Sequence, residues 1–266
     1  SAKNGCFYYG KVWYSGVGYE ERGVSVMEMV LFLLIILFAT VLQTSTGFGF
    51  STLATPLLLF LFAPAEAIQI NLILSLVLSL SLIKSIRKYI DYGMLKRFIL
   101  GSSIGVFIGI AFFILIDINS LKMFVGLVVL MLSVMLLFKF SIMKSRRKER
   151  IVGIISGSLT SSIGMPGPPL LLYFSGTDNS KEVVRSTTLA YYLFIYSVSL
   201  IVQVIFAGTS ETTWISSLWA LPVVFVGLYL GQVLFKRISQ SVFQVIIYII
   251  LFATGISLLM NSLGWL

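Results

Sequence analysis

The 266-residue sequence contains no histidine and only one cysteine, Cys6. Without histidine the chain has no imidazole base and no Ser-His or Cys-His nucleophile. With a single cysteine it has no disulfide within the chain and no cysteine-based zinc site. These absences exclude the commonest catalytic and metal centres, and we expect a protein without metal or cofactor that is not an enzyme.

Charged residues are scarce as well: they make up 11% of the chain, against 58% hydrophobic residues, and the mean hydropathy is +1.01. A soluble protein of this length needs more charge to cover its surface, so we expect lipid to be its main solvent. A bilayer core about 30 Å thick needs roughly 20 apolar helical residues per crossing. Spans of about that length are predicted at residues 68–83, 98–116, 121–138, 187–206, 218–235 and 242–260. These spans are too long for the strands of a β-barrel, and their residues do not alternate between apolar and polar. Both features predict an all-α integral membrane protein.

The net charge of +9 does not indicate a nucleic-acid partner, because the basic residues lie in short loops between the apolar spans. That distribution is typical of membrane topology. We therefore expect a multi-pass protein of a bacterial inner (plasma) membrane whose partners are lipid and a small solute. The sequence leaves a homo-oligomer open.

Residues 1–26 are rich in Gly and Tyr and contain no apolar run, so they do not form a secretory signal peptide. Two interpretations stay open. The segment is a disordered tail, or it lies upstream of a native start at Met27. The interpretation with a start at Met27 rests on residues 20–23, EERG. This is the peptide that results when a purine-rich ribosome-binding site is translated in frame.

The rest of the chain divides into two similar halves. Residues 46–50 read TGFGF and precede Pro56 and a run of leucines, and residues 163–169 read IGMPGPP and also precede leucines. Two glycine pairs match further on, Gly105 and Gly109 in the first half, Gly227 and Gly231 in the second. We expect a first transmembrane repeat at residues 27–139, a basic cytoplasmic linker at 140–150 and a second repeat at 151–266.

Charge indicates how the halves are oriented. The basic loop at residues 84–97 corresponds to residues 207–213, where the only charge is Glu211. The next loops reverse the sign, with Asp117 in the first half and two basic residues at 236–237 in the second. Corresponding loops therefore lie on opposite sides of the membrane, which predicts two inverted repeats, each a Gly/Pro-broken segment followed by three transmembrane helices.

The two broken segments differ in length. Residues 150–175 hold too few apolar residues for two complete crossings, which predicts a re-entrant hairpin that enters and leaves on one face. Residues 30–62 are longer, so a hairpin and two full crossings both stay open there.

The breaks themselves indicate a binding site, because non-helical backbone at membrane depth is tolerated only around a buried cavity. Half-helices that start after Gly49 and at Pro168 direct free N–H groups and positive dipole ends at that cavity, and these donors favour an anion with several oxygens. The candidate binding residues are Gln43, Thr44, Ser45, Thr46, Gly47 and Gly49 at the first break, Gln69 and Asn71 after it, Ser161, Ser162, Gly164, Gly167 and Pro168 at the second, and Arg185 and Thr188 after that.

Structural roles are the alternatives. Arg185 is either a bidentate partner of an oxyanion or one more basic anchor at the cytoplasmic side. The Ser/Thr clusters are either site or hydrogen bonds between helices, and for the two glycine pairs close helix packing is favoured. No acidic residue lies midway along a span, which argues against a proton relay, although Glu66 and Glu182 lie just beside the hairpins.

The sequence contains, twice, a Gly-rich break, a Pro, a run of leucines and a short polar motif. This repeated pattern resembles that of the TauE/SafE sulfite exporter family, also called TSUP. The polar motifs are residues 69–71 and 185–188, and the resemblance extends from about Met27 to the end. It implies a membrane transporter of sulfite, thiosulfate, sulfoacetate or a related organic anion. Ser51 stands where a third glycine is frequent in the family, and residues 69–71 stand where Gly-Thr-Ser is frequent, so the anion stays open.

These observations predict a permease that carries a small anion by alternating access around the two hairpins. A passive anion channel on the same scaffold is the alternative, and an intramembrane enzyme is disfavoured because no span holds a Ser-Lys arrangement or paired carboxylates. A negative cell interior favours anion export by about 2.3 kcal/mol per charge per 100 mV. Direction and coupling ion stay open.

Overall fold

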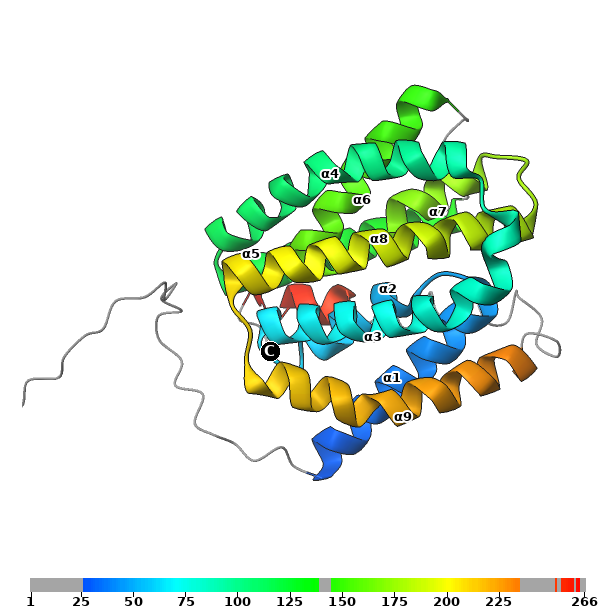
Figure 1. The fold of residues 1–266 in the computed structure, drawn as a ribbon. Helices are drawn as coiled ribbons and strands as arrows, with labels where there is room; N and C mark the ends of the chain where they lie inside the picture. The colour runs from blue at the N-terminus through cyan, green and yellow to red at the C-terminus, as the bar shows by residue number, and fades with distance from the viewer. Residues whose placement is uncertain (1–25, 139–144, 235–251, 253–254, 261, 264–266) are drawn as a thin grey trace, which may run out of the picture.

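The structure is a computed structural model that describes residues 26–138, 145–234, 252, 255–260 and 262–263. All secondary structure in this part of the chain is helical (Figure 1). The helices are α1 (Val26–Thr46), α2 (Phe50–Leu58), α3 (Pro64–Ile86), a 3-10 turn η1 (Arg87–Tyr89), α4 (Tyr92–Leu115), α5 (Ile118–Leu137), α6 (Arg146–Ile163), α7 (Gly167–Ser175), α8 (Lys181–Ala207) and α9 (Glu211–Leu234). The predicted tail, the first part of the linker and much of the span at 242–260 lie outside the described residues.

Five described helices, α1, α3, α4, α8 and α9, are long and apolar enough to cross a bilayer. The predicted spans at 68–83, 98–116, 121–138, 187–206 and 218–235 coincide with α3, α4, α5, α8 and α9. Large apolar side chains are exposed on the outer helices, among them Phe107 on α4 and Trp219 on α9. Such surfaces need lipid around them, so the all-helical membrane class is confirmed.

Both broken segments are hairpins of one long and one short helix. Chain reversal occurs at residues 47–49 between α1 and α2, and at residues 164–166 between α6 and α7. Gly47, Gly49 and Gly164 have positive φ angles of 85°, 105° and 72°, which side-chain-bearing residues rarely adopt. The short helices have nine residues each, about 14 Å, and reach only halfway across a bilayer. In residues 30–62, only α1 is therefore long enough to cross a bilayer.

Polar residues fix where several helices begin. Asp91 accepts a hydrogen bond from the backbone N–H of Met94 at the start of α4, and Ser180 accepts one from Val183 at the start of α8. The backbone N–H of Ser120 donates to the Asp117 carboxylate before α5, which lowers the pKa of that carboxyl. The helix α6 begins at Arg146, so the last residues of the predicted linker are already helical.

Glycines allow two helix pairs to approach closely. α4 lies against α6, where a Cβ atom added to Gly105 would be 2.1 Å from the Ile154 carbonyl oxygen. α1 lies against α9, where a Cβ atom added to Gly227 would be 2.7 Å from the Cβ of Thr40. Neither site has room for a side chain, so the packing interpretation of these glycines is confirmed. The central pair is α3 and α8, which lie beside each other (Figure 1).

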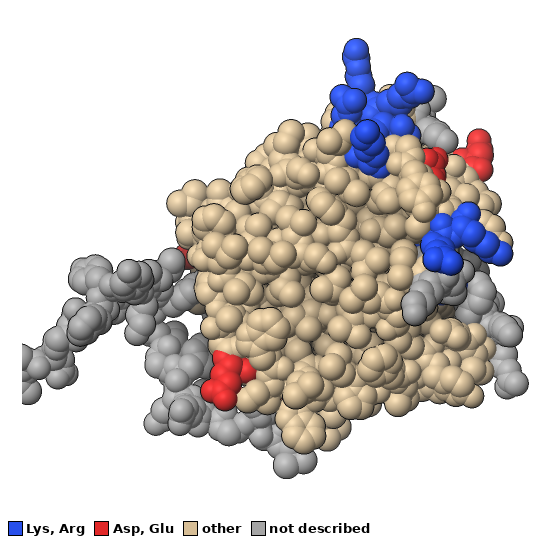
Figure 2. All heavy atoms as spheres, viewed as in Figure 1, with Lys and Arg blue, Asp and Glu red and all other residues tan. Residues whose placement is uncertain are grey.

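The basic residues gather at one end of the bundle. The end of α3 and the starts of α4, α6 and α8 meet there, and a hydrogen bond of 3.0 Å from the Asp91 backbone N–H to the Thr187 hydroxyl joins two of them. Every described Lys and Arg except Lys122 belongs to this basic end. Figure 2 shows the basic side chains at the top and right, next to a broad uncharged surface. We call the other side, where α3 starts and α8 ends, the opposite end.

Candidate functional site

The tips of the two hairpins contact the central helices α3 and α8. Asn71 of α3 donates a hydrogen bond of 2.8 Å to the carbonyl of Gly164, at the α6/α7 break. Arg185 of α8 donates one of 3.0 Å to the carbonyl of Thr44, just before the α1/α2 break, and its side-chain stem lies against Gly47. Each central helix thus contacts the broken hairpin of the other half, and the two sets of contacts involve five of the predicted residues.

The start of α2 offers donors to this centre. Gly49 precedes it without a side-chain cap, and the N–H of Phe50 donates to the Gln43 side-chain oxygen at 3.2 Å. The next N–H groups, of Ser51 and Thr52, have no acceptor within the helix, as at any helix start. The Gln43 side-chain nitrogen is buried and has no hydrogen-bond partner among the described residues. The positive end of the helix dipole therefore faces a polar centre.

The start of α7 offers fewer donors. The helix begins at Gly167, one residue earlier than predicted, and continues with Pro168 and Pro169. Prolines fit the first turn because their missing N–H has no partner there anyway, but for the same reason they donate nothing. Of the first three residues of α7, only Gly167 carries an N–H group. The two half-helices are therefore unequal as anion sites.

Hydroxyl groups that the sequence analysis did not single out complete the centre. A Cβ atom added to Gly167 would lie 3.0 Å from the Tyr192 hydroxyl and 3.3 Å from the Thr52 hydroxyl. Close by, the hydroxyls of Ser51 and Tyr196 are 3.1 Å apart. A signal for the tyrosines exists in the sequence, because Arg185, Thr188, Tyr192 and Tyr196 recur every three or four residues and so share one face of α8.

Several predicted residues bond to helix backbone instead. Ser161 donates to the Val106 carbonyl of α4 at 2.8 Å, and Ser162 donates within α6 to Ser158 at 2.7 Å. Ser45 likewise donates to Leu42, within α1. In these positions the hydroxyls serve helix structure and helix contact, the alternative role considered for them.

Three further candidates lie in different surroundings. Gln69 donates a hydrogen bond of 2.7 Å to the carbonyl of Gly208. This contact lies toward the opposite end of the bundle and not at the basic end. Thr188 is buried on α8, and its hydroxyl has no hydrogen-bond partner in the described part of the chain. The side chain of Thr46 is outside the described residues.

Comparison with protein families identifies the family of the chain. Residues 32–258 match the family model of the sulfite exporter TauE/SafE, a range that includes both broken hairpins and the central helices. The chain belongs to this family. TauE/SafE proteins are membrane transporters and not enzymes, so the chain is a multi-pass transporter with a small substrate. No curated protein and no solved structure gives a significant match.

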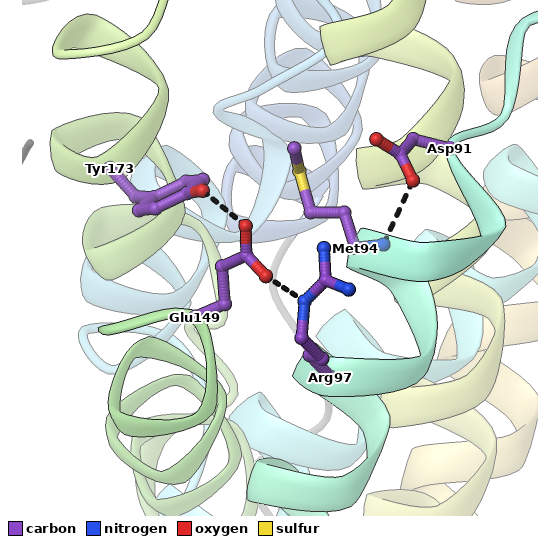
Figure 3. A network of polar contacts seen from close by, with 5 residues as sticks. All are labelled: Asp91, Met94, Arg97, Glu149 and Tyr173. Atoms are coloured by element: carbon purple, nitrogen blue, oxygen red, sulfur yellow. Dashed lines mark hydrogen bonds and ion pairs between the residues drawn. The ribbon is translucent and has the colours of Figure 1, made fainter. Parts of the chain in front are cut away.

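This TauE/SafE chain also carries a buried carboxylate that the sequence analysis assigned to the linker. Glu149, on the first turn of α6, is 1% exposed and is the one fully buried acidic residue among those described. Arg97 of α4 pairs with one carboxylate oxygen, and the Tyr173 hydroxyl of α7 donates to the other at 2.6 Å (Figure 3). The carboxylate therefore joins the outer end of the short helix α7 to α4 and α6, away from the hairpin tips.

Proposed function

We propose that this TauE/SafE transporter carries a small oxyanion that binds where the two hairpin tips meet. The observation that carries the proposal is the group of buried polar atoms around the breaks, including the side-chain nitrogen of Gln43 and the hydroxyls of Thr52 and Tyr192. These atoms have no partner among the described residues. A polar atom buried without a partner destabilises a protein by about 1–3 kcal/mol. A ligand that accepts hydrogen bonds supplies the missing partners.

The inverted-repeat architecture is part of the proposal, and the helix contacts support it. Gly105 meets the carbonyl of Ile154 in one interface, and Gly227 meets that of Leu37 in the other. Ile154 lies ten residues before Gly164, the glycine at the second break. Leu37 likewise lies ten residues before Gly47, the glycine at the first break. The two interfaces thus use corresponding residues of the two halves, as a two-fold relation requires.

Orientation follows from the positive-inside rule. The basic end is cytoplasmic in this proposal, because short cytoplasmic loops carry the excess of Lys and Arg. The α6/α7 hairpin then enters from the cytoplasm, and the α1/α2 hairpin enters from the outside. Their tips meet near the middle of the bilayer, where half-helix dipoles act on an ion without competition from bulk water.

Alternating access is the proposed mechanism, with the two hairpins opening in turn to the two sides. The side chains at the tips are almost completely buried: Gln43 and Asn71 are 0% exposed and Tyr192 is 1% exposed. A permanently open channel would expose its lining, so the burial favours a carrier that occludes its substrate. The family description favours sulfite as the anion, and the resemblance of the residue pattern adds thiosulfate, an organosulfonate or another organic acid.

Transport by the purified protein in liposomes tests the proposal. Vesicles preloaded with unlabelled sulfite, thiosulfate or methanesulfonate are diluted into the same radiolabelled anion, and accumulation of label is followed. Saturable counterflow of at least one of these anions, absent from protein-free liposomes, is the expected result. Absence of flux for all of them would contradict the proposal, and a conductance that does not saturate would indicate a passive channel instead.

A further inference from the structure

Two hydroxyl groups from different halves of the chain meet at the first residue of α7. Thr52 belongs to the first hairpin and Tyr192 to the central helix of the second half. Both approach Gly167 so closely that the position of its absent side chain lies 3.0 Å from one hydroxyl and 3.3 Å from the other. Glycine at this position therefore keeps open the space that the two hydroxyls face.

Neither hydroxyl has a hydrogen-bond partner in the described part of the protein. Thr52 is 6% exposed and Tyr192 is 1% exposed. Buried hydroxyls in folded proteins nearly always have a partner. Two unsatisfied donors around one glycine, beside the starts of two half-helices, therefore indicate a ligand that accepts both bonds.

A polar stripe on α8 leads to this point from both ends of the bundle. Its members follow one another at steps of three or four residues and are Arg185, Thr188, Tyr192, Tyr196, Ser199 and Gln203. All except Arg185 are fully buried. Within the described chain, Thr188, Tyr192 and Ser199 have hydroxyls without a partner. Tyr192 lies in the middle of this stripe, as expected for a binding position halfway along a permeation path.

We propose that the hydroxyls of Thr52 and Tyr192 bind the oxygens of the transported anion directly, next to the N–H of Gly167. This inference rests on the proposed transport function and adds the substrate-binding residues to it. The donors at this point are neutral. Because the free energy of removing an ion from water rises with the square of its charge, the site favours a singly charged oxyanion, such as a sulfonate or hydrogensulfite.

Replacement of Tyr192 by phenylalanine removes one donor and almost no volume. We expect Tyr192→Phe to raise the KM for sulfite counterflow roughly ten- to a hundredfold, the usual effect of losing a hydrogen bond to a charged group. Tyr191→Phe is the matched control, because Tyr191 is the adjacent, equally buried tyrosine of α8. Equal KM values in the two variants would overturn the proposal, and absence of transport by the wild type would instead contradict the proposed function.

Thr52 and Gly167 provide tests that do not depend on the tyrosine variant folding. Thr52→Val should raise the KM to a similar extent, and Thr52→Ser, which keeps the hydroxyl, should restore it. Gly167→Ala places a methyl group between the two hydroxyls and should abolish transport while the purified protein stays monodisperse. Wild-type kinetics in Thr52→Val or in monodisperse Gly167→Ala would each overturn the assignment.

Competition between anions tests the preference for one charge. Excess methanesulfonate, which carries one charge, should inhibit uptake of labelled sulfite by the wild type, whereas sulfate, which carries two, should inhibit at least tenfold less. Tyr192→Phe should lower the sensitivity to methanesulfonate. Inhibition by sulfate equal to that by methanesulfonate would overturn the charge preference.

Discussion

At the scale of single residues, Arg185 is a basic side chain that contacts the first break. It is partly buried, donates to the Thr44 carbonyl, and packs along Gly47 at the first break. An arginine that only marks the cytoplasmic side has no need of this position, because Arg150 at the same end is exposed. The contacts favour the role of positioning the hairpin tip and attracting the anion.

We expect Arg185→Lys and Arg185→Gln both to impair transport, because neither side chain keeps the planar guanidinium group. The lysine variant should lose about tenfold in kcat/KM for sulfite, and the glutamine variant more. Arg150→Lys and Arg150→Gln are the matched controls and should transport like the wild type. Full activity of Arg185→Lys would contradict this role and leave arginine as a simple cationic anchor.

Residue identities were predicted best where the backbone itself requires them. Gly47 and Gly164 were found from the sequence because positive φ angles select glycine. Tyr192 and Thr52 were not among the predicted site residues, because only the packing of α2, α7 and α8 brings their hydroxyls to Gly167. Glu149 was assigned to the linker for a related reason. It stands in the charged run RRKER, and its burial depends on Arg97 and Tyr173, which lie far away in the sequence.

At the scale of helices, glycine contacts hold the long helices of the two halves together. A Cβ atom added to Gly101, Gly105 or Gly109 would lie 2.1 Å from a backbone carbonyl oxygen of α6. Carbonyl oxygens of a helix cannot move aside as a flexible side chain does, so the whole interface must separate. Bilayer helices depend on such close packing, since lipid supplies little hydrophobic force between them.

Gly105→Ala should therefore destabilise the protein by about 1–3 kcal/mol, the range for overpacked interiors. Gly93→Ala, in the exposed first turn of the same helix, should be neutral or slightly stabilising because alanine favours helix formation. Thermal unfolding of both variants in detergent provides the measurement. Equal melting temperatures for the two would mean that α4 and α6 do not approach as closely as described.

The hairpins show what sequence patterns can and cannot determine at this scale. The Gly/Pro breaks and the shortness of the second segment predicted a returning half-helix, and α7 has that form. The first segment stayed ambiguous because α1 alone has 21 residues, enough for about 31 Å, and the apolar run continues beyond the break. Its form is decided by where α2 stops, at Leu58, which composition does not indicate.

At the scale of the whole molecule, charge distribution relates the fold to the membrane. The three helix starts at the basic end carry Lys96, Arg97, the run at residues 146–150, and Arg185. Glu66 and Glu211 lie at the opposite end, where Glu66 accepts a hydrogen bond from Ser210 at 2.7 Å. This separation is what the loop charges predicted. Which end faces the cytoplasm remains a prediction that follows from the positive-inside rule.

Cysteine labelling tests that orientation. In a background with Cys6→Ser, Lys88→Cys places a thiol at the basic end and Glu211→Cys places one at the opposite end, and both positions are exposed. A membrane-impermeant maleimide added to intact cells should label position 211 at once and position 88 only after permeabilisation, because short basic loops stay in the cytoplasm. Labelling of position 88 alone in intact cells would mean that the orientation in the membrane is the reverse of the predicted one. It would also make the α1/α2 hairpin, and with it the donors at the start of α2, accessible from the cytoplasm and not from the outside.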